Sequence, residues 1–179
     1  MAGPEAEETP EEAGAAEPAP EAEERHGVPV TRPLGQVVLH PPRDRWVEVV
    51  TALRDEGFNL CSEVTAVDYL THAGRVLPEG VAPERFEVVA QLVSFEHRER
   101  VRLRVQVPEA EPEVASLFEV FPGTEAPERE VFDMYGISFT GHPDLTRILM
   151  PEDWDGHPLR KDYGIGSIPV QFKGASNAR

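Results

Sequence analysis

The sequence predicts an α+β domain in which a mixed or antiparallel sheet carries helices on one face, with a disordered acidic N-terminal tail and an extended C-terminal segment. Two adjacent runs over residues 85–95 and 99–107 are the strongest strand signals, and their short separation indicates an antiparallel hairpin. Apolar residues recur at helical spacing elsewhere, so helices and strands are mixed along the chain. The sequence contains no internal repeat and no glycine-rich phosphate-binding loop.

Composition excludes several classes of protein. The 179 residues carry 17 Lys and Arg against 33 Asp and Glu, a formal net charge of -16, so binding of a nucleic-acid backbone is not the main activity. No run approaches about 18 apolar residues, which argues against a membrane span. The sequence near the N-terminus also lacks the apolar stretch of a secretory signal, so secretion is not expected. Cys61 is the only cysteine, so cysteines alone provide no disulfide, zinc or iron–sulfur site. A reduced, cytoplasmic protein is expected.

The acidic charge is concentrated at the N-terminus. The first 25 residues contain nine Glu against one Arg, which sums to -8, and no Val, Ile, Leu or aromatic residue. Such a stretch cannot bury enough apolar surface to offset the entropy lost on ordering. We predict a disordered acidic tail over residues 1–35, an α+β domain over 36–140 and an extended, partner-wrapping segment over 141–179. The tail is either a solubilising or partner-tuning arm or a dispensable extension.

The first elements of the domain are a strand and a helix. Residues 36–40 form a short apolar run suited to an edge strand, which two prolines end. Residues 43–56 have helical spacing, with an apolar stripe made by Trp46, Val49, Val50 and Leu53. Gly57 follows where a helix C′ residue is expected. The single apolar stripe indicates that this helix lies on a sheet.

The centre of the chain is rich in strand signals. Residues 58–60 and 64–70 predict two strand pieces, and 71–84, with two Gly and two Pro, predict a loop. In residues 99–107 apolar and polar side chains alternate, so one face of this strand is buried and the other is wet. The three residues between it and the run at 85–95 suit a hairpin turn.

Two further helices are predicted after the hairpin. Residues 111–121 carry a stripe of Val114, Leu117, Phe118 and Phe121, with a proline near the first helical position. Residues 125–135 form the other helix, which is acidic in its first turn, as the helix dipole favours, and has Gly136 as its C′ residue. From Gly141 onward large apolar residues persist without a period, which is typical of a segment that lies across another surface.

Several residues are candidates for chemical sites. Glu130 and Asp133 lie three residues apart on the predicted helix and form a candidate acid/base pair, although ion pairs that order the helix are the favoured explanation. His142 and His157, with Asp144, Asp153 and Asp155 nearby, lack the spacing of a metal site. Cys61 is expected to be a buried small apolar residue rather than a reactive thiol.

The run from Leu159 to Tyr163 is a better candidate for function, as a contact with another protein. It combines Arg160, which can pair in a bidentate way with a carboxylate, with Tyr163, an amphipathic anchor. Both residue types are enriched at the centres of protein interfaces. The competing explanation is an ordinary solvated run of charges.

One long motif identifies a family. The string EREVFDMYGISFTGHPDLTRILMPEDWDGHPLRKDY, over Glu128–Tyr163, closely resembles the signature of the C subunit of the proton-pumping NADH:quinone oxidoreductase, respiratory complex I. Upstream, TAVDY (Thr65–Tyr69) and RFEVVAQLVS (Arg85–Ser94) are also similar to that family, so the resemblance covers about residues 36–163 in order. Two positions depart from it: Ala126 replaces an aromatic residue and Thr146 replaces a basic one.

The resemblance implies a set of fold-and-docking residues, none of them catalytic, cofactor-binding or metal-binding. These are Glu128, Arg129, Glu130, Asp133, Gly136, Gly141, His142, Pro143, Asp144, Arg147, Pro158, Leu159, Arg160, Lys161, Asp162 and Tyr163.

The resemblance also implies a role. The chain would be a non-catalytic scaffold in the peripheral arm, docked chiefly on the D subunit and also near the B and I subunits, on the cytoplasmic side of the cell membrane. NADH oxidation, quinone reduction, electron transport and proton translocation would belong to the assembly, whose FMN and iron–sulfur clusters lie on other subunits. The alternatives are the equivalent subunit of a membrane-bound hydrogenase or of a dehydrogenase with another electron donor, and a free-standing acid/base enzyme.

Overall fold

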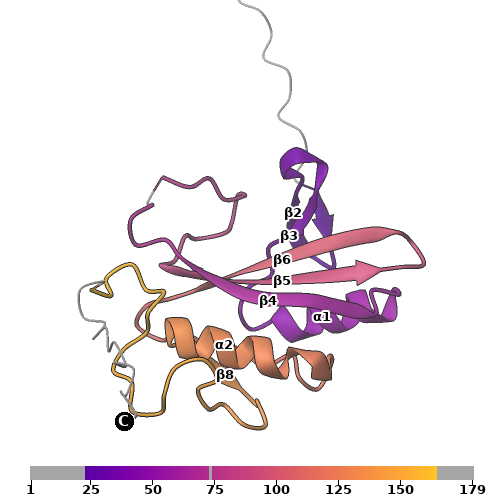
Figure 1. The fold of residues 1–179 in the computed structure, drawn as a ribbon. Helices are drawn as coiled ribbons and strands as arrows, with labels where there is room; N and C mark the ends of the chain where they lie inside the picture. Colours follow the sequence, from indigo (N-terminus) through magenta and orange to yellow (C-terminus); the bar gives the residue numbers. More distant parts are fainter. Residues whose placement is uncertain (1–22, 73, 165–179) are drawn as a thin grey trace, which may run out of the picture.

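The computed structural model describes residues 23–72 and 74–164, which form a six-stranded mixed sheet, a small two-stranded sheet and two α-helices (Figure 1). In chain order the elements are β1 (Glu24–Arg25), β2 (Val28–Thr31), η1 (Pro33–Gly35), β3 (Val37–Leu39), α1 (Trp46–Asp55), β4 (Leu60–Asp68), β5 (Phe86–Ser94), β6 (Glu99–Val107), β7 (Glu113–Ala115), η2 (Pro122–Thr124), α2 (Glu125–Tyr135) and β8 (Ser138–Thr140).

The predicted hairpin is confirmed and forms the centre of the large sheet. Strands β5 and β6 pair antiparallel from Phe86 opposite Val107 to Ser94 opposite Glu99. The strand order is β1-β2-β3-β6-β5-β4, and β3 pairs parallel with β6, so the sheet is mixed. The apolar residues of β6 are fully buried while its arginines face the other side, because successive side chains of a strand point to opposite faces.

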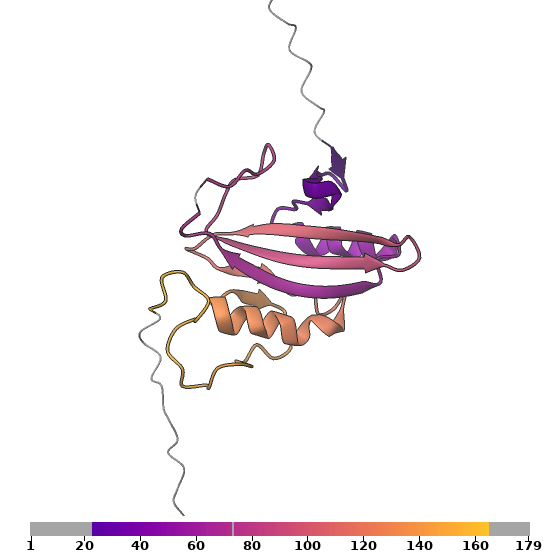
Figure 2. The ribbon, with the colours of Figure 1, turned by 45° about the horizontal axis from the view of Figure 1, so that its top comes forward.

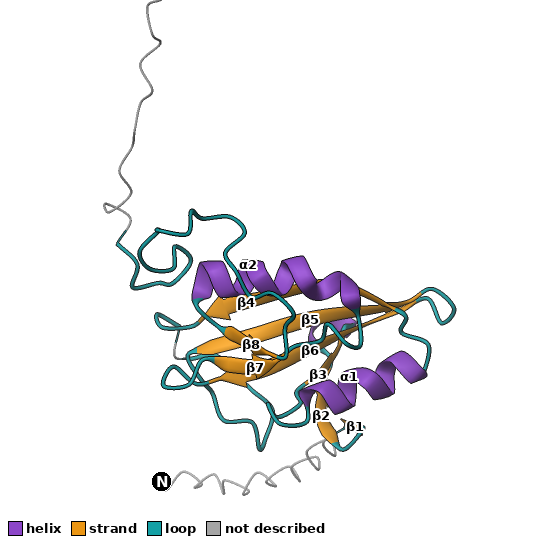
Figure 3. Cartoon of the chain, turned by 90° about the horizontal axis from the view of Figure 1, so that it is seen from below, coloured by secondary structure: helices purple, strands orange, loops and turns teal. Residues whose placement is uncertain are grey.

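Both helices cover the same face of this sheet, which confirms the predicted fold class. Figure 3, seen from below, shows α1 and α2 in front of the strands, and Figure 2 shows α2 beneath β4. The predicted stripe of α1 is fully buried, from Trp46 to Leu53. Each such side chain contributes about 1.5–3 kcal/mol to the free energy of unfolding. Within residues 23–72 and 74–164, no helix is long and apolar enough to cross a membrane.

The predicted helix over residues 111–121 is wrong. Residues 113–115 form β7, which pairs parallel with β8, and a turn follows. Three of the four residues of the expected stripe are still buried, namely Val114, Leu117 and Phe121, whereas Phe118 is only partly buried. The helix does not form because the carboxylate of Glu128 accepts hydrogen bonds from the Ser116 hydroxyl and from the Leu117 N–H. These bonds, made to another element, replace the hydrogen bonds that a local helix would make.

The boundary predicted for the acidic tail is also too late. Residues 24–25 and 28–31 form strands β1 and β2, inside the range assigned to a tail. Because β2 pairs with β3, the run at 36–40 is an internal strand instead of the predicted edge strand. Val28 is fully buried, which supplies the apolar anchor for this extension of the sheet. The rest of the predicted tail, residues 1–22, lies outside the described residues.

The position of β2 yields a testable boundary. Deleting residues 1–22 is expected to change the free energy of unfolding by less than about 0.5 kcal/mol, because no apolar anchor is lost. Deleting residues 1–31 removes buried Val28 and Val30 and is expected to cost about 3–6 kcal/mol. Denaturant unfolding of both truncations against the full chain checks this. Equal losses, or none from the longer deletion, would contradict the assignment of β2 to the core sheet.

Candidate functional site

The C-terminal motif is assembled between α2 and the segment that follows β8. In Figure 1 this segment, coloured orange to yellow, loops beneath and beside α2. Residues 141–164 contain no helix or strand, so their shape depends on side chains that bond their backbone. We call residues 141–164, together with α2, the platform.

Asp133 organises the centre of the platform. Its side chain is fully buried, and Oδ2 accepts the backbone N–H groups of Ile148, Leu149 and Met150 at 3.1, 2.7 and 2.8 Å. Its Oδ1 accepts from Arg147 Nη1 at 2.6 Å. Burial alone would raise the pKa of Asp133, but the three N–H groups and the Arg147 guanidinium outweigh it and lower the pKa below its ordinary value. Asp133 therefore holds the loop through its ionised carboxylate.

Two arginines extend this network into the segment. Arg147 Nη2 donates to the carbonyl oxygens of Trp154 and Gly156, both at 3.1 Å. Arg129 on α2 donates to the carbonyl of Thr146 at 3.1 Å and to its hydroxyl at 2.9 Å. The hydroxyl of Thr146 accepts this bond, which a basic side chain at that position cannot do. Thr146, where the resemblance leads us to expect a basic residue, therefore adds a side-chain acceptor to the contact between Arg129 and the segment.

The end of α2 is closed by close packing around Gly136. This glycine has φ of 70°, the left-handed conformation that the predicted C′ position requires. His157 Nδ1 bonds the carbonyl of Asp133 at 2.9 Å, and Arg160 Nε donates to the carbonyl of Tyr135 at 2.6 Å. A Cβ on Gly136 would lie 2.5 Å from His157 Nε2 and 2.8 Å from Arg160 Nη2. The segment therefore approaches the helix end as closely as a glycine permits.

A second attachment joins the segment to the large sheet. Asp68, at the end of β4, accepts the Lys161 N–H at 2.9 Å and pairs with Arg85 at 2.9 Å. Arg85, itself buried, also pairs with Asp162 at 2.8 Å. Hydrogen bonds to Asp68, Asp162 and Glu109 raise the pKa of Arg85, so its charge is permanent. Residues 161–162 are thereby held beside the β4–β5 end of the sheet.

The first part of the platform is held by hydrogen bonds that Glu128 and His142 make within the chain. Glu128 is fully buried, and burial raises its pKa while its bonds to Ser116 and Leu117 oppose that shift. His142 Nε2 lies 3.0 Å from the carbonyl of Glu125, and its Nδ1 accepts the N–H of Asp144 at 3.1 Å. Glu128 and His142 therefore act within the chain, one joining α2 to the β7 turn and the other closing the start of the segment.

The outer side of the platform is apolar and exposed. Ile148 is 41% exposed, Leu149 59% and Leu159 46%. The backbone N–H groups of all three residues are bonded to the platform itself, through Asp133 for the first two and Met134 for Leu159. Large side chains are thus presented to solvent on a backbone that is already fixed. We call these three residues the apolar triad.

The other chemical candidates do not form sites. Glu130 is exposed whereas Asp133 is buried and bonded elsewhere, so the two carboxylates are not an acid/base pair. Among residues 23–72 and 74–164, no group of three or more His, Cys, Asp or Glu side chains is arranged to hold a metal ion. Cys61 is half-buried against the core, and burial raises the pKa of its thiol to about 11, which keeps it protonated at neutral pH.

The structure brings most of the predicted motif residues together and adds several that sequence reasoning missed. Gly141, Pro143 and Asp144 are at the turn after β8, apart from the Asp133 network. The missed residues are Asp68, Arg85 and Gly156, which bond or face the segment. Asp68 and Arg85 lie in the upstream strings TAVDY and RFEVVAQLVS, so their place in family-like sequence was the signal that could have found them.

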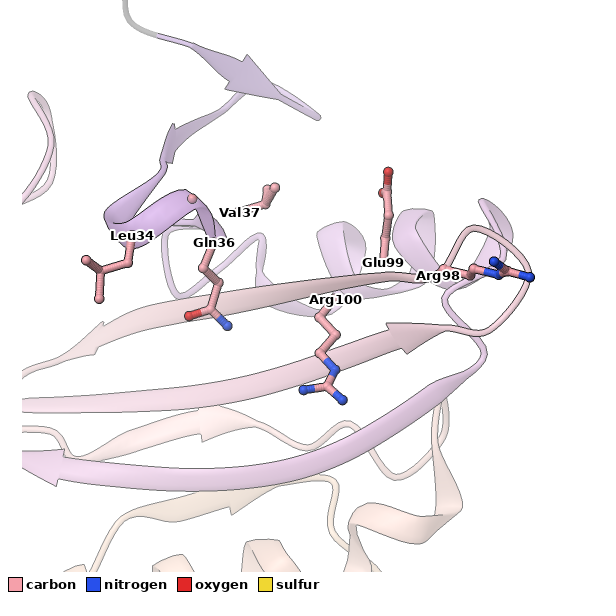
Figure 4. A pocket seen from close by; sticks show the side chains of 7 residues that line it. Leu34, Gln36, Val37, Arg98, Glu99 and Arg100 are labelled. Atoms are coloured by element: carbon pink, nitrogen blue, oxygen red, sulfur yellow. The ribbon is translucent and has the colours of Figure 1, made fainter.

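The surface also carries hollows whose lining does not include the apolar triad. Figure 4 shows one of about 470 Å³ between η1 and the β5–β6 turn, where the guanidinium groups of Arg98 and Arg100 point away from one another. Its lining side chains are mostly exposed and converge on no common point. This hollow therefore offers no arrangement of groups suited to binding a ligand.

Comparison with known sequences matches most of the chain. A model of the family described as "Respiratory-chain NADH dehydrogenase, 30 Kd subunit" matches residues 39–168. A relative from Saccharopolyspora erythraea, named as the C subunit of NADH-quinone oxidoreductase, is 45% identical over 149 residues, which are 82% of this chain and 56% of that protein. The chain therefore spans about half the length of the curated relatives it matches.

Comparison with solved structures supports the same fold. The trypsin-resistant fragment (1–134) of Nqo5 is 36% identical, with a TM-score of 0.59 over 66% of this chain and 90% of that fragment. A chain of the membrane-bound sulfane sulfur reductase, an archaeal respiratory membrane complex, is 20% identical with a TM-score of 0.64, covering 90% of this chain and 92% of that one. The second likeness concerns the fold alone.

Proposed function

The chain belongs to the family of the 30 kDa subunit of the respiratory-chain NADH dehydrogenase, and from that premise we propose that it is a non-catalytic scaffold subunit of a membrane-bound NADH:quinone oxidoreductase. It supports the quinone module of the peripheral arm by docking on the large D subunit, with the B and I subunits as further neighbours. NADH oxidation and the coupling of quinone reduction to proton translocation are properties of the assembly.

The observation that carries this proposal is the apolar triad on the platform. Ile148, Leu149 and Leu159 are exposed while the backbone beneath them is bonded through Asp133 and Met134. A preformed apolar surface loses little conformational entropy on binding, which favours a stable interface. The segment over residues 141–179 is thus proposed to lie across the partner, with the triad at the centre of the contact.

A role without chemistry of its own fits how the ionisable groups of the motif are used. Asp133, Arg147 and Arg160 are bonded to backbone groups of the same chain, so they hold a surface instead of facing a substrate. FMN, the iron–sulfur clusters and the NADH and quinone sites are then expected on other subunits. We propose that the chain lies on the cytoplasmic side of the cell membrane, attached only through the complex.

A second candidate is the equivalent subunit of a membrane-bound hydrogenase or of a dehydrogenase that uses another electron donor. This second candidate is supported by the fold that the chain shares with a chain of an archaeal respiratory membrane complex, because one fold can serve assemblies of different activity. The donor site lies on other chains in both proposals. Identification of the subunits recovered with the tagged chain from solubilised membranes separates them: NADH-module proteins support the first proposal, and their replacement by hydrogenase subunits supports the second.

The docking role is tested by removing the apolar surface without touching its support. Replacing both Leu149→Ser and Leu159→Ser is expected to weaken recovery of the D subunit at least about tenfold, because each buried leucine contributes about 1.5–3 kcal/mol. The melting temperature of the isolated variant should be unchanged, since both side chains are exposed. Leu34→Ser, at an exposed leucine elsewhere, is the matched control. Unchanged recovery of the D subunit with the double variant would refute the docking role.

A further inference from the structure

The large sheet has a second face, which lies away from the platform and which the docking role does not use. Both α-helices of the described residues cover the other face, and Figure 2 shows β4, β5 and β6 in front of α1. Leu92 of β5 and Val101 of β6 are fully buried in the core. Successive side chains of a strand point to opposite faces, so the residues that alternate with these two lie on the uncovered face.

Part of the uncovered face is apolar. Leu60 of β4 lies opposite Val93 of β5, which in turn lies opposite Arg100 of β6, so the three residues form one row across the strands. Leu60 is 40% exposed, Val93 and Val89 are half-buried, and Phe95, the first residue after β5, is 70% exposed. Exposed aromatic residues and arginines are enriched where one protein contacts another. The sheet-face patch, as we name it, consists of Leu60, Val89, Val93, Phe95, Arg100 and Arg102.

The two arginines of the patch lack an anionic partner. Among residues 23–72 and 74–164, neither Arg100 nor Arg102 forms an ion pair, and Arg102 makes one side-chain hydrogen bond, of 3.4 Å, to Gln91. Arg104, the next arginine on the same face of β6, pairs with Glu87 at 2.6 Å. Two neighbouring positive charges on one face repel each other unless an anion lies against them. The patch therefore combines apolar side chains with a demand for carboxylates.

Composition decides between the possible occupants of the patch. Residues 1–22 of this chain carry seven Glu but no Val, Ile, Leu or aromatic residue, so they match the arginines and not the apolar side chains. A second copy, a nucleic acid or an anionic membrane is opposed by the net charge of -16 on the whole chain. The occupant that fits both parts is a segment of another protein that carries apolar and acidic side chains together.

Geometry specifies the form of that segment. Strands β5 and β6 are already paired on both sides, so a further strand cannot add to them, whereas helices pack across sheet faces. Arg100 and Arg102 lie about 6.6 Å apart along β6, at about 3.3 Å per residue. Residues four apart on a helix rise by about 6 Å, and a helix about 10 Å wide covers two strands. One edge of a helix can therefore face both arginines while its centre lies over Val89 and Val93.

We propose that the sheet-face patch binds an amphipathic helix of a neighbouring subunit, with two carboxylates four residues apart along one edge. The carboxylates pair with Arg100 and Arg102, and the apolar stripe of the helix packs on Val89, Val93 and Leu60. The helix supplies the third layer of a sheet that this chain covers on one face only. This inference rests on the proposed function, because it requires an assembly that contains other subunits.

The test places a photo-cross-linker on the patch in the assembled complex. Phe95→p-benzoylphenylalanine keeps an aromatic ring at an exposed position. After irradiation of the complex recovered from solubilised membranes, mass spectrometry is expected to identify one segment of another subunit. That segment should carry two Asp or Glu four residues apart beside apolar residues at helical spacing. The same derivative at Val76, an exposed residue of the loop between β4 and β5, is the control and should not label this segment.

The outcomes separate this inference from the proposed function. Cross-linking to residues 1–22 of this chain, to a second copy or to a segment without the paired carboxylates would overturn the inference. So would the absence of a cross-link from Phe95 in a complex that contains the D subunit, or equal labelling of the segment from Val76. Recovery of no other subunit with the unmodified chain would refute the proposed function, and this inference with it.

A charge reversal tests the role of the arginines. In the chain with the cross-linker at Phe95, Arg100→Glu is expected to lower the yield of the cross-link at least about threefold, because it sets like charges together. The melting temperature of the free chain and recovery of the D subunit should not change, since Arg100 is exposed and lies outside the platform. Arg54→Glu, at an exposed arginine of α1, is the matched control. An undiminished yield with Arg100→Glu would show that the occupant is not selected by its carboxylates.

Discussion

Asp133→Ala is expected to lower the free energy of unfolding of the full chain by about 3–5 kcal/mol. The substitution removes the carboxylate and leaves the Ile148, Leu149 and Met150 N–H groups and the Arg147 guanidinium without their acceptor. A chain of this size loses about 2–4 °C of melting temperature per kcal/mol, so a loss of about 10 °C is expected. Calorimetry or denaturant unfolding measures it.

The matched control is Glu130→Ala, which removes an exposed carboxylate from the same helix. It should change the free energy of unfolding by no more than about 0.5 kcal/mol. Proteolysis across residues 141–164 should accelerate in the Asp133 variant and not in the control, because the loop loses its attachment to α2. If the Asp133→Ala variant unfolds within about 1 kcal/mol of the wild type, the carboxylate does not organise the platform.

The ionisation of Asp133 also makes the free energy of unfolding depend on pH. The folded-state pKa of Asp133 is lowered, so its ionisation stabilises the fold above the ordinary value of 3.8, and this contribution is lost as the pH falls through the folded-state pKa. The difference in free energy of unfolding between wild type and Asp133→Asn should therefore be constant from neutral pH to about pH 5 and shrink at lower pH. A difference that persists undiminished well below about pH 3 would show that the ionised carboxylate is not responsible.

Gly136→Ala is expected to cost about 3 kcal/mol of folding free energy, the second large effect. The left-handed conformation alone costs an alanine about 1–2 kcal/mol. In addition, the new Cβ would lie 2.5 Å from His157 Nε2 and 2.8 Å from Arg160 Nη2. Neither side chain can move away freely, because each is hydrogen-bonded to a carbonyl at the end of α2. Overpacking of this kind costs about 1–3 kcal/mol more.

Three companion variants separate the two causes. Gly141→Ala, at φ of 86° with no atom within 4 Å of the new Cβ, should show the backbone cost alone, and Gly123→Ala, also in open space, should be nearly neutral. The double variant Gly136→Ala with His157→Ala should be more stable than the sum of the single effects by at least about 0.5 kcal/mol. Strict additivity would mean that the segment does not press on the helix end as the structure places it.

The sequence alone determined the elements whose signals are local. The β5–β6 hairpin and α1 follow from periodicity within ten or so residues, and α2 follows from its acidic first turn and its C′ glycine. Gly57 and Gly136 mark helix ends because the chain takes a left-handed conformation there. The long motif over residues 128–163 likewise pointed to the family without any knowledge of the fold. Each of these signals is complete within a short stretch of chain.

What the tertiary structure decided depends on hydrogen bonds between distant residues. Residues 111–121 have a helical stripe, yet Glu128 bonds Ser116 and Leu117 from another element, and pairing with β8 makes part of the run a strand. Strands β1 and β2 form inside a predicted tail because β3 offers β2 a partner and β2 in turn pairs with β1.

Asp133 shows the same limit at the site. Its spacing predicts ion pairs along α2, with Arg129 and Glu130 as its helical neighbours, but its carboxylate instead accepts N–H groups 15 to 17 residues away. A buried carboxylate bonds whichever donors the fold brings to it, and chain spacing records only the donors of its own helix. The sequence therefore determined which residues belong to the platform, and only the packing of the segment on α2 determined what each of them holds.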